Sequence, residues 1–115
     1  MFGIQFKQGE VVLVPMPFSD LSESKPRPAL IISNDAHNSK VDDIVVCGIT
    51  SNIRDEEFSV IIEQKDMAEG ILPFLSRIKV DKLFTLEKRI IKRKLGRIKP
   101  EVLAKVKKEF ARLIA

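Results

Sequence analysis

A Lys-Pro-Arg-Pro segment at positions 25–28 stands between two apolar runs, at positions 11–14 and 29–32. Proline fixes its own φ at about −65° and disfavours the helical region for the residue before it. Pro28 therefore pushes Arg27 toward extended backbone, and Pro26 does the same to Lys25. The segment predicts an arginine with little backbone freedom at the end of a strand.

Other short apolar runs follow between polar turns, and prolines interrupt them because proline cannot donate to a sheet. We expect strands at residues 10–14, 27–33, 44–50, 58–62 and 75–80. Residues 17–26, rich in Ser, Asp and Glu, predict a surface loop, and residues 34–39 a polar turn. The run at 44–50 does not alternate, which is typical of a strand buried on both faces.

Within the fifth predicted strand, Arg77, Lys79 and Asp81 alternate with Ile78 and Val80, so the charged and apolar side chains should lie on opposite faces. Residues 90–98 fit either a sixth strand or a short helix.

Pro100 suits the first position of a helix, and apolar residues follow it at helical spacing: Leu103, Val106, Phe110 and Leu113. This helix should pack its apolar stripe on the sheet. The whole pattern predicts a mainly β fold, a small barrel of five to six antiparallel strands closed by a C-terminal α-helix.

At 115 residues the chain fits one domain, residues 1–115. No apolar run approaches the ~18 residues of a membrane span, and no secretory signal is visible, so we expect a cytoplasmic protein without membrane contact. Cys47 is the only cysteine and lies inside an apolar run. It fits a reducing cytosol and an inert buried thiol.

The charges are unevenly distributed along the chain. Positions 1–70 carry 6 Lys and Arg against 12 Asp and Glu, whereas positions 71–115 carry 14 against 4. This asymmetry predicts a basic surface for a polyanion. A solvated lysine-rich face is the alternative.

Several kinds of site are disfavoured by composition. With one His, one Cys and no ligand-like carboxylate cluster, we expect no metal site. His37 falls in the predicted turn with no nucleophile elbow nearby, and glycine-rich phosphate loops are absent. Trp and Tyr are absent and most Phe residues lie in apolar runs, which favours recognition of a nucleic-acid backbone over base stacking.

Arg27 suits backbone recognition because a planar guanidinium can donate two charge-assisted hydrogen bonds to phosphate oxygens. A cluster of short polar side chains, Thr50, Ser51 and Asn52, ends the third predicted strand. A salt bridge between loop and sheet is an equally compatible interpretation of Arg27 on its chemistry alone.

The order of short motifs along the chain decides between these two interpretations of Arg27. Residues 9–14, 17–18, 25–33, 49–51, 70–72, 76–81, 85–86 and 95–98 together resemble the PemK/MazF-like toxins of type II toxin–antitoxin systems. The resemblance implies an SH3-like barrel that forms a homodimer. It also implies a sequence-specific endoribonuclease that cuts single-stranded RNA without a metal or other cofactor, through attack of the ribose 2′-OH and formation of a cyclic phosphate.

The resemblance assigns the catalytic arginine to Arg27 and the catalytic threonine to Thr50. Arg77 and Asp81 are the nearest counterparts of an Arg and an Asp that contribute in some members. Asp81 is the better proton acceptor, since a guanidinium stays protonated up to a pKa above ~12. We further expect RNA contacts from Lys25, Ser51, Asn52, Arg77 and Lys79.

The implied partners are a cognate antitoxin, whose acidic segment would suit the basic C-terminal part, and promoter DNA bound by the toxin–antitoxin complex. Residues 18–24 and Ser51-Asn52 depart from patterns of some members, so the cleaved RNA sequence does not carry over. The alternative function is a non-catalytic SH3-like regulatory module that binds nucleic acid or protein.

Overall fold

The computed structural model describes residues 4–15 and 25–115, so most of the predicted 17–26 loop lies outside the described residues. The elements follow one another as β1 (Glu10–Pro15), β2 (Pro26–Ile31), α1 (Asp35–Lys40), β3 (Asp43–Thr50), β4 (Ser59–Ile62), η1 (Gln64–Asp66), β5 (Met67–Gly70), β6 (Ser76–Glu87), η2 (Lys88–Ile90), β7 (Arg93–Ile98) and α2 (Pro100–Ile114).

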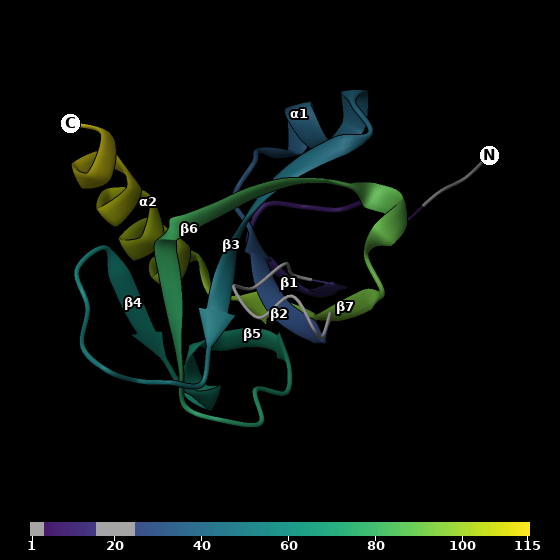
Figure 1. The fold of residues 1–115 in the computed structure, drawn as a ribbon. Helices are drawn as coiled ribbons and strands as arrows, with labels where there is room; N and C mark the ends of the chain where they lie inside the picture. Colours follow the sequence, from purple (N-terminus) through teal and green to yellow (C-terminus); the bar gives the residue numbers. More distant parts are fainter. Residues whose placement is uncertain (1–3, 16–24) are drawn as a thin grey trace.

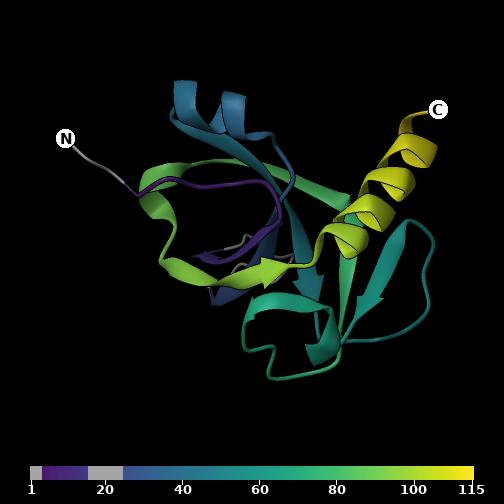
Figure 2. The same ribbon diagram turned by 180° about the vertical axis from the view of Figure 1, so that it is seen from behind.

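Within the described ranges, seven strands form one antiparallel sheet in the order β4-β6-β3-β2-β1-β7-β5. The sheet curls into a partly open barrel, and α2 lies beside β4 and the first half of β6 (Figures 1 and 2). The predicted mainly β fold with a C-terminal helix is therefore confirmed, with more strands than the five to six expected.

The long strand β6 produces much of the curl. Its first half pairs with β4 on one side and β3 on the other, and its second half pairs with the start of β3. Between the halves the register with β3 shifts, from Gly48 opposite Lys79 to Cys47 opposite Leu83. The extra residues make a bulge, which bends a strand and increases its twist.

The central strands are buried on both faces. One core cluster joins the inner face of the barrel to α2 and includes Leu30, Ile49 and Ile78. The other covers the opposite face of β1, β2 and β3 and includes Val14 and Val46. The prediction of a third strand buried on both faces is confirmed, because both clusters draw residues from β3.

The helix α2 begins at Pro100, as predicted, and its apolar stripe packs on the sheet. Val102 and Val106 are its buried residues, and Leu103 and Phe110 are partly buried against the same core. Val102, which directly precedes Leu103, adds a buried residue to the predicted stripe.

The predicted polar turn at residues 34–39 is wrong, because α1 forms there. Asn34 is its N-cap, and its side-chain oxygen accepts a hydrogen bond from the His37 backbone N–H at 2.8 Å. Such a cap satisfies a donor that the first turn leaves without a partner. Asn38 is buried, with its amide donating to the Ser33 carbonyl at 2.8 Å.

The strand alternative for residues 90–98 is correct, since β7 occupies most of this range after η2. The strand β5 was not predicted from sequence. Gly70 and Gly96 are partners in the β5–β7 ladder, and a Cβ on Gly96 would lie 2.3 Å from the Glu69 carbonyl oxygen. Two glycines thus permit the backbones of β5 and β7 to approach closely. No alternation of apolar residues in the sequence indicates this pairing.

Candidate active site

The strands β2 and β3 separate at one end of the sheet. Their ladder runs from Ile31–Val46 to Ala29–Gly48, and the preceding β2 residues Pro26, Arg27 and Pro28 are in register with β1. Neither proline has an N–H to offer β3. The prolines that restrict Arg27 therefore also leave a gap between two neighbouring strands.

A hollow of about 460 Å³, here called the β2–β3 hollow, lies at this gap. Its lining is mostly apolar, with a few polar side chains at positions 27, 51, 76 and 93. The lining residues are Val11, Leu13, Pro26, Arg27, Pro28, Ile49, Ser51, Met67, Ile71, Leu72, Pro73, Phe74, Ser76, Arg93 and Leu95. The structure thus brings Arg27 and Ser51 to one concavity, together with Arg93 and Phe74, which the sequence analysis did not select, whereas Thr50 is not among the lining residues.

Arg27 and Thr50 belong to the same face of the sheet. Ala29 and Gly48 are direct partners, and side chains alternate along each strand, so the residues two positions away on either strand return to that face. Those residues are Arg27 on β2 and Thr50 on β3. Neighbouring strands lie about 4.8 Å apart, and the gap at this end widens that spacing.

Arg77 extends this row to a third strand. It is the direct partner of Thr50 in the β3–β6 ladder, so their side chains share a face. Arg27, Thr50 and Arg77 therefore stand on adjacent strands β2, β3 and β6. Each of the two strands that flank Thr50 thus carries an arginine on the same face of the sheet.

Arg77 is only 9% exposed, and its guanidinium is held by two neighbours. Its Nη1 donates to the Ser59 hydroxyl at 3.0 Å and lies 3.7 Å from a carboxylate oxygen of Asp55. Its buried Nε has no hydrogen-bond partner among the described residues. A buried donor without a partner costs free energy, so Arg77 retains capacity for an additional acceptor.

Lys79 is likewise covered by an acidic residue. Its ammonium pairs with the Glu56 carboxylate, and this hydrogen bond lowers the pKa of Glu56 below its ordinary value. Asp55 and Glu56 belong to the connection between β3 and β4, so this acidic connection lies over the two cations of β6. The Asp55 side chain is 98% exposed, which makes its contact with Arg77 easy to displace.

The polar cluster at the end of β3 forms a local turn. The Asn52 backbone N–H donates to the Thr50 hydroxyl oxygen at 3.1 Å, and the Asn52 side-chain oxygen accepts from the Arg54 N–H at 3.3 Å. Thr50 accepts through its oxygen and keeps its O–H as a donor. Lys25 lies just before β2, exposed and outside the lining of the β2–β3 hollow.

Asp81 lies in the β6 bulge and is exposed. The bulge flanks Cys47 and Gly48, two to three residues from Thr50, which corresponds to roughly 7–10 Å along an extended strand. The predicted alternation holds up to this bulge, because Ile78 and Val80 are buried while Asp81 is exposed. Asp81 is therefore near the Arg27–Thr50 row without being one of its direct register partners.

The unequal charges of the two chain segments largely meet in the fold. Within residues 4–15 and 25–115, four ion pairs join a cation after position 70 to an acid before it: Arg77–Asp55, Lys79–Glu56, Lys94–Glu10 and Arg97–Glu69. The excess of cations in the C-terminal part is thus partly neutralised within the molecule. Exposed cations such as Arg93 at the β2–β3 hollow contribute more to the surface potential than the total count.

Burial raises the pKa of the Cys47 thiol to about 12, and the Asp81 carboxylate adds to the rise. We predict that iodoacetamide alkylates the native protein at pH 8 at least about 10³-fold more slowly than the unfolded chain, since three pH units separate this pKa from the ordinary 9.0. Because the unfolded chain loses its proton first, stability should fall as the pH rises above 9. Mass spectrometry reads the labelling directly, and equal rates for native and unfolded protein would refute a buried thiol.

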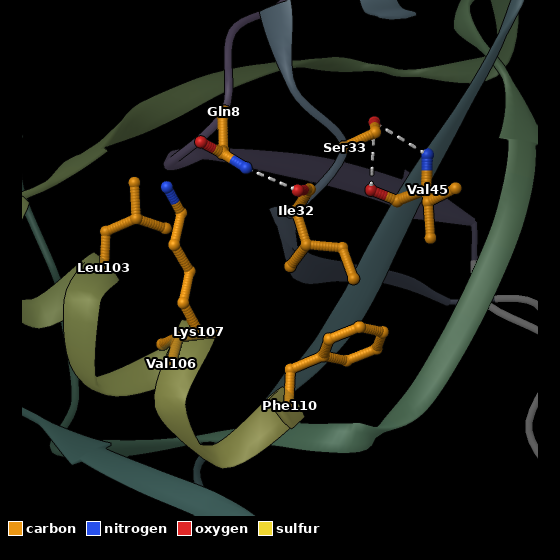
Figure 3. A pocket seen from close by; sticks show the side chains of 8 residues that line it. All are labelled: Gln8, Ile32, Ser33, Val45, Leu103, Val106, Lys107 and Phe110. Carbon is orange, nitrogen blue, oxygen red and sulfur yellow. Dashed lines mark hydrogen bonds between the residues drawn. The ribbon is translucent and has the colours of Figure 1, made fainter. Parts of the chain in front are cut away.

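A second pocket, of about 390 Å³, lies between α2 and the sheet (Figure 3). Leu103, Val106 and Phe110 of α2 face Ile32 across it, and Lys107 reaches along one side. The Gln8 and Ser33 side chains in this pocket form hydrogen bonds with the protein backbone. Gln8 donates to the Ile32 carbonyl at 2.8 Å, and the Ser33 hydroxyl accepts from the Val45 N–H at 3.0 Å. This pocket therefore belongs to the attachment of the helix.

Among residues 4–15 and 25–115, no group of three His, Cys, Asp or Glu side chains is arranged to hold a metal ion. No helix in the same ranges has the length and apolar character needed to cross a membrane.

The chain matches the family model of the PemK-like, MazF-like toxins of type II toxin–antitoxin systems over residues 7–114. The comparison with curated proteins found no match. Among solved structures, an endoribonuclease in complex with its cognate antitoxin, from Mycobacterial species, is 25% identical, with a TM-score of 0.76 over 94% of this chain and 93% of that one.

Two further structures share the fold. An endoribonuclease from Mycobacterial species is 24% identical, with a TM-score of 0.77 over 99% of this chain and 95% of that one. A MazE–MazF structure from Deinococcus radiodurans is 21% identical, with a TM-score of 0.76 over 98% of each chain. With a family match that spans nearly the whole sequence, the chain belongs to the PemK-like, MazF-like toxin family of type II toxin–antitoxin systems.

Proposed function

We propose that this chain is the toxin of a toxin–antitoxin system and a sequence-specific endoribonuclease for single-stranded RNA. Family membership supports the first part, and the 25% identical endoribonuclease supports the second. The observation that carries the proposal is the shared face of Arg27 and Thr50 on adjacent strands, with Arg77 opposite Thr50. A cation, a hydroxyl donor and a second cation are suited to one phosphodiester group.

In the proposed reaction the ribose 2′-oxygen forms a bond to the adjacent phosphorus. The bond from that phosphorus to the 5′-oxygen of the next nucleotide breaks. The 2′-hydroxyl proton passes to a base, and the departing 5′-oxygen takes up a proton from solvent. The products are a 2′,3′-cyclic phosphate and a 5′-hydroxyl, and no step in this sequence requires a metal ion.

Arg27 would donate two hydrogen bonds to the phosphate oxygens and offset the charge that grows on them in the crowded transition state. Thr50 would donate its O–H to one of the same oxygens. Its oxygen already accepts from the Asn52 N–H, which fixes the hydroxyl position before the substrate binds. Both groups would thus be positioned in advance, which is the main requirement for this kind of electrostatic stabilisation.

Asp81 is the proposed proton acceptor. Its carboxylate is exposed in the β6 bulge, two to three residues along β3 from Thr50, so a nucleotide that spans this distance could reach both. A carboxylate can accept a proton at neutral pH, whereas a protonated guanidinium is a donor only and has no lone pair to accept one. In this proposal Asp81 accepts the proton, and Arg27 stabilises the negative charge of the phosphate.

The RNA strand would be held by the polar residues around this row: Lys25, Ser51, Asn52, Arg77 and Lys79. Asp55 and Glu56 now lie over the two β6 cations, so a phosphate would have to displace these carboxylates. A phosphate that displaces Asp55 would take its place beside the Arg77 Nη1.

The proposed partners follow from the same surface. We propose a homodimer, inhibited by a cognate antitoxin whose acidic segment competes with RNA for the exposed cations, and a toxin–antitoxin complex that binds promoter DNA. The 25% identical relative is itself an endoribonuclease in complex with its cognate antitoxin. The proposed site of action is the cytoplasm, where its RNA substrate is present.

The test begins with long single-stranded RNA incubated with the protein in EDTA, which locates the cut. Oligonucleotides that span it are then made with ribose or with 2′-deoxyribose on the 5′ side of the cut. We predict cleavage of the ribose strand alone, with a cyclic phosphate found by mass spectrometry. Cleavage of the deoxyribose strand or a need for added metal would contradict the mechanism. Salt-sensitive binding without any cleavage would favour the non-catalytic module.

A further inference from the structure

An exposed aromatic ring borders the β2–β3 hollow. Phe74 lies in the connection between β5 and β6, and it is 67% exposed. Ile71, in the same connection, is 78% exposed. Figure 1 shows this connection along the lower edge of the molecule, between the end of β5 and the start of β6. Both residues line the β2–β3 hollow, and exposed apolar side chains gathered at one concavity are typical of a binding site.

The connection is held in one conformation although it contains no regular structure. The Gln64 side chain accepts from the Leu72 N–H at 2.7 Å and donates to the Gly70 carbonyl at 3.0 Å. At the other end, the Ser76 hydroxyl donates to the Phe74 carbonyl at 2.8 Å. Pro73 fixes the backbone between these contacts. Phe74 therefore lies in a connection that is preorganised, which lowers the entropy lost on binding.

The lining of the hollow also carries positive charge. Arg27 and Arg93 are among its lining residues, as are Ser51 and Ser76. A mostly apolar lining that includes an exposed aromatic ring suits a flat, uncharged ring system, and arginines in the same lining suit anions attached to it. An unpaired nucleotide has both parts, because a base with a π-face is joined to phosphates on either side.

From this arrangement we propose that Phe74 is the stacking surface for one unpaired nucleobase of the RNA, with the adjoining phosphate at Arg27 and Arg93. This inference rests on the proposed function and adds to it a base-binding residue. It also revises the sequence-based preference for backbone recognition alone. Phe74 lies in an apolar run of the sequence, at positions 71–75, yet the fold leaves its ring exposed beside the candidate active site.

The chain has no Trp, so a single introduced Trp reports on its own surroundings. We would compare Phe74→Trp with Ile114→Trp, because Phe74 and Ile114 are both 67% exposed and Ile114 lies at the far end of α2. The probe is a mixed-sequence single strand of 2′-O-methyl RNA, which binds but cannot supply the attacking hydroxyl. We expect this strand to quench the fluorescence of Phe74→Trp and to leave that of Ile114→Trp unchanged.

A second measurement separates stacking from other losses. Phe74→Ala should weaken binding of the same strand by roughly 5- to 100-fold, the range seen when a stacking aromatic is removed. Against a strand with abasic positions, wild type and Phe74→Ala should bind equally. Ile114→Ala is the matched control and should bind both strands as the wild type does.

Three results would overturn the inference. The strand could bind without quenching the fluorescence of Phe74→Trp, or Phe74→Ala could weaken binding of the intact and abasic strands equally. In the third, Phe74→Ala would change only the self-association of the protein. The last would assign the ring to a protein contact. Since the probe cannot be cut, these outcomes are independent of the nuclease test. Cleavage of RNA without quenching removes the inference alone, and quenching without cleavage removes only the enzymatic part of the proposed function.

Discussion

Replacing Arg27 by alanine should slow cleavage of single-stranded RNA by about 10²–10³-fold, the usual cost of removing one donor that stabilises a transition-state oxyanion. The change removes both hydrogen bonds that the guanidinium offers to the phosphate. Arg27 is exposed at the start of β2, so the fold should persist and the melting temperature should move by a few degrees at most. Single-turnover kinetics in EDTA measure the rate, and circular dichroism measures the fold.

Two variants make the Arg27 result specific. Arg27→Lys keeps the charge and loses the planar pair of donors, so it should recover only part of the rate. Arg89→Ala removes an arginine of η2 whose side chain is 77% exposed and paired with Glu87, and it should cleave as the wild type does. Equal activity in Arg27→Ala and Arg89→Ala would exclude Arg27 from catalysis.

Replacing Thr50 by valine should reduce the single-turnover rate by about 10²-fold or more through loss of one hydroxyl donor. Valine keeps the branched shape, and the substitution leaves the strand β3 intact. It also removes the acceptor for the Asn52 N–H, so the turn at residues 50–52 should loosen. Substrate binding, measured on the uncleavable 2′-O-methyl strand, should change less than the rate.

Thr85→Val is the matched control for Thr50. Thr85 is an exposed threonine on the second half of β6, where it pairs with Val45. Its substitution makes the same chemical change on the same sheet, away from the Arg27–Thr50 row. We expect unchanged cleavage. A similar loss in both variants would indicate that valine damages the sheet, and then Thr50 would have no demonstrated role.

The sequence predicts those parts of the fold in which local patterns are strong. Prolines mark the ends of β1 and α2, and the alternation at residues 77–80 correctly separates Arg77 and Lys79 from the buried Ile78 and Val80. The strand 58–62 begins one residue later than expected, because Phe58 has a φ of 55°. This left-handed conformation is uncommon outside glycine and carries no sequence signature here.

Features that depend on distant partners could not be predicted. β5 exists because Gly70 and Gly96 allow two backbones to approach closely, and these residues lie far apart in the sequence. Asn38 belongs to a polar segment, yet it is buried by hydrogen bonds to Ser33. Polar composition alone gave no sign of either.

The candidate site was predicted unevenly for the same reason. Arg27 could be selected because two prolines restrict it locally. Phe74 and Arg93 could not, because the pairing of β5 with β7 and the hydrogen bonds of Gln64 bring them to the hollow. The ion pairs of Arg77 and Lys79 with acidic residues at positions 55–57 could not be predicted either. In the sequence those carboxylates resemble solvated charges of a surface loop.

The central claim is that Arg27 and Thr50 act on one phosphate group, and a double-mutant cycle tests it most directly. Single-turnover cleavage in EDTA would be measured for the wild type, Arg27→Ala, Thr50→Val and the double variant. Groups that serve one transition state are strongly non-additive. We predict that the double variant loses little more than the worse single variant, about 10³-fold. A loss equal to the product of the two single effects, about 10⁴–10⁶-fold, would contradict the account.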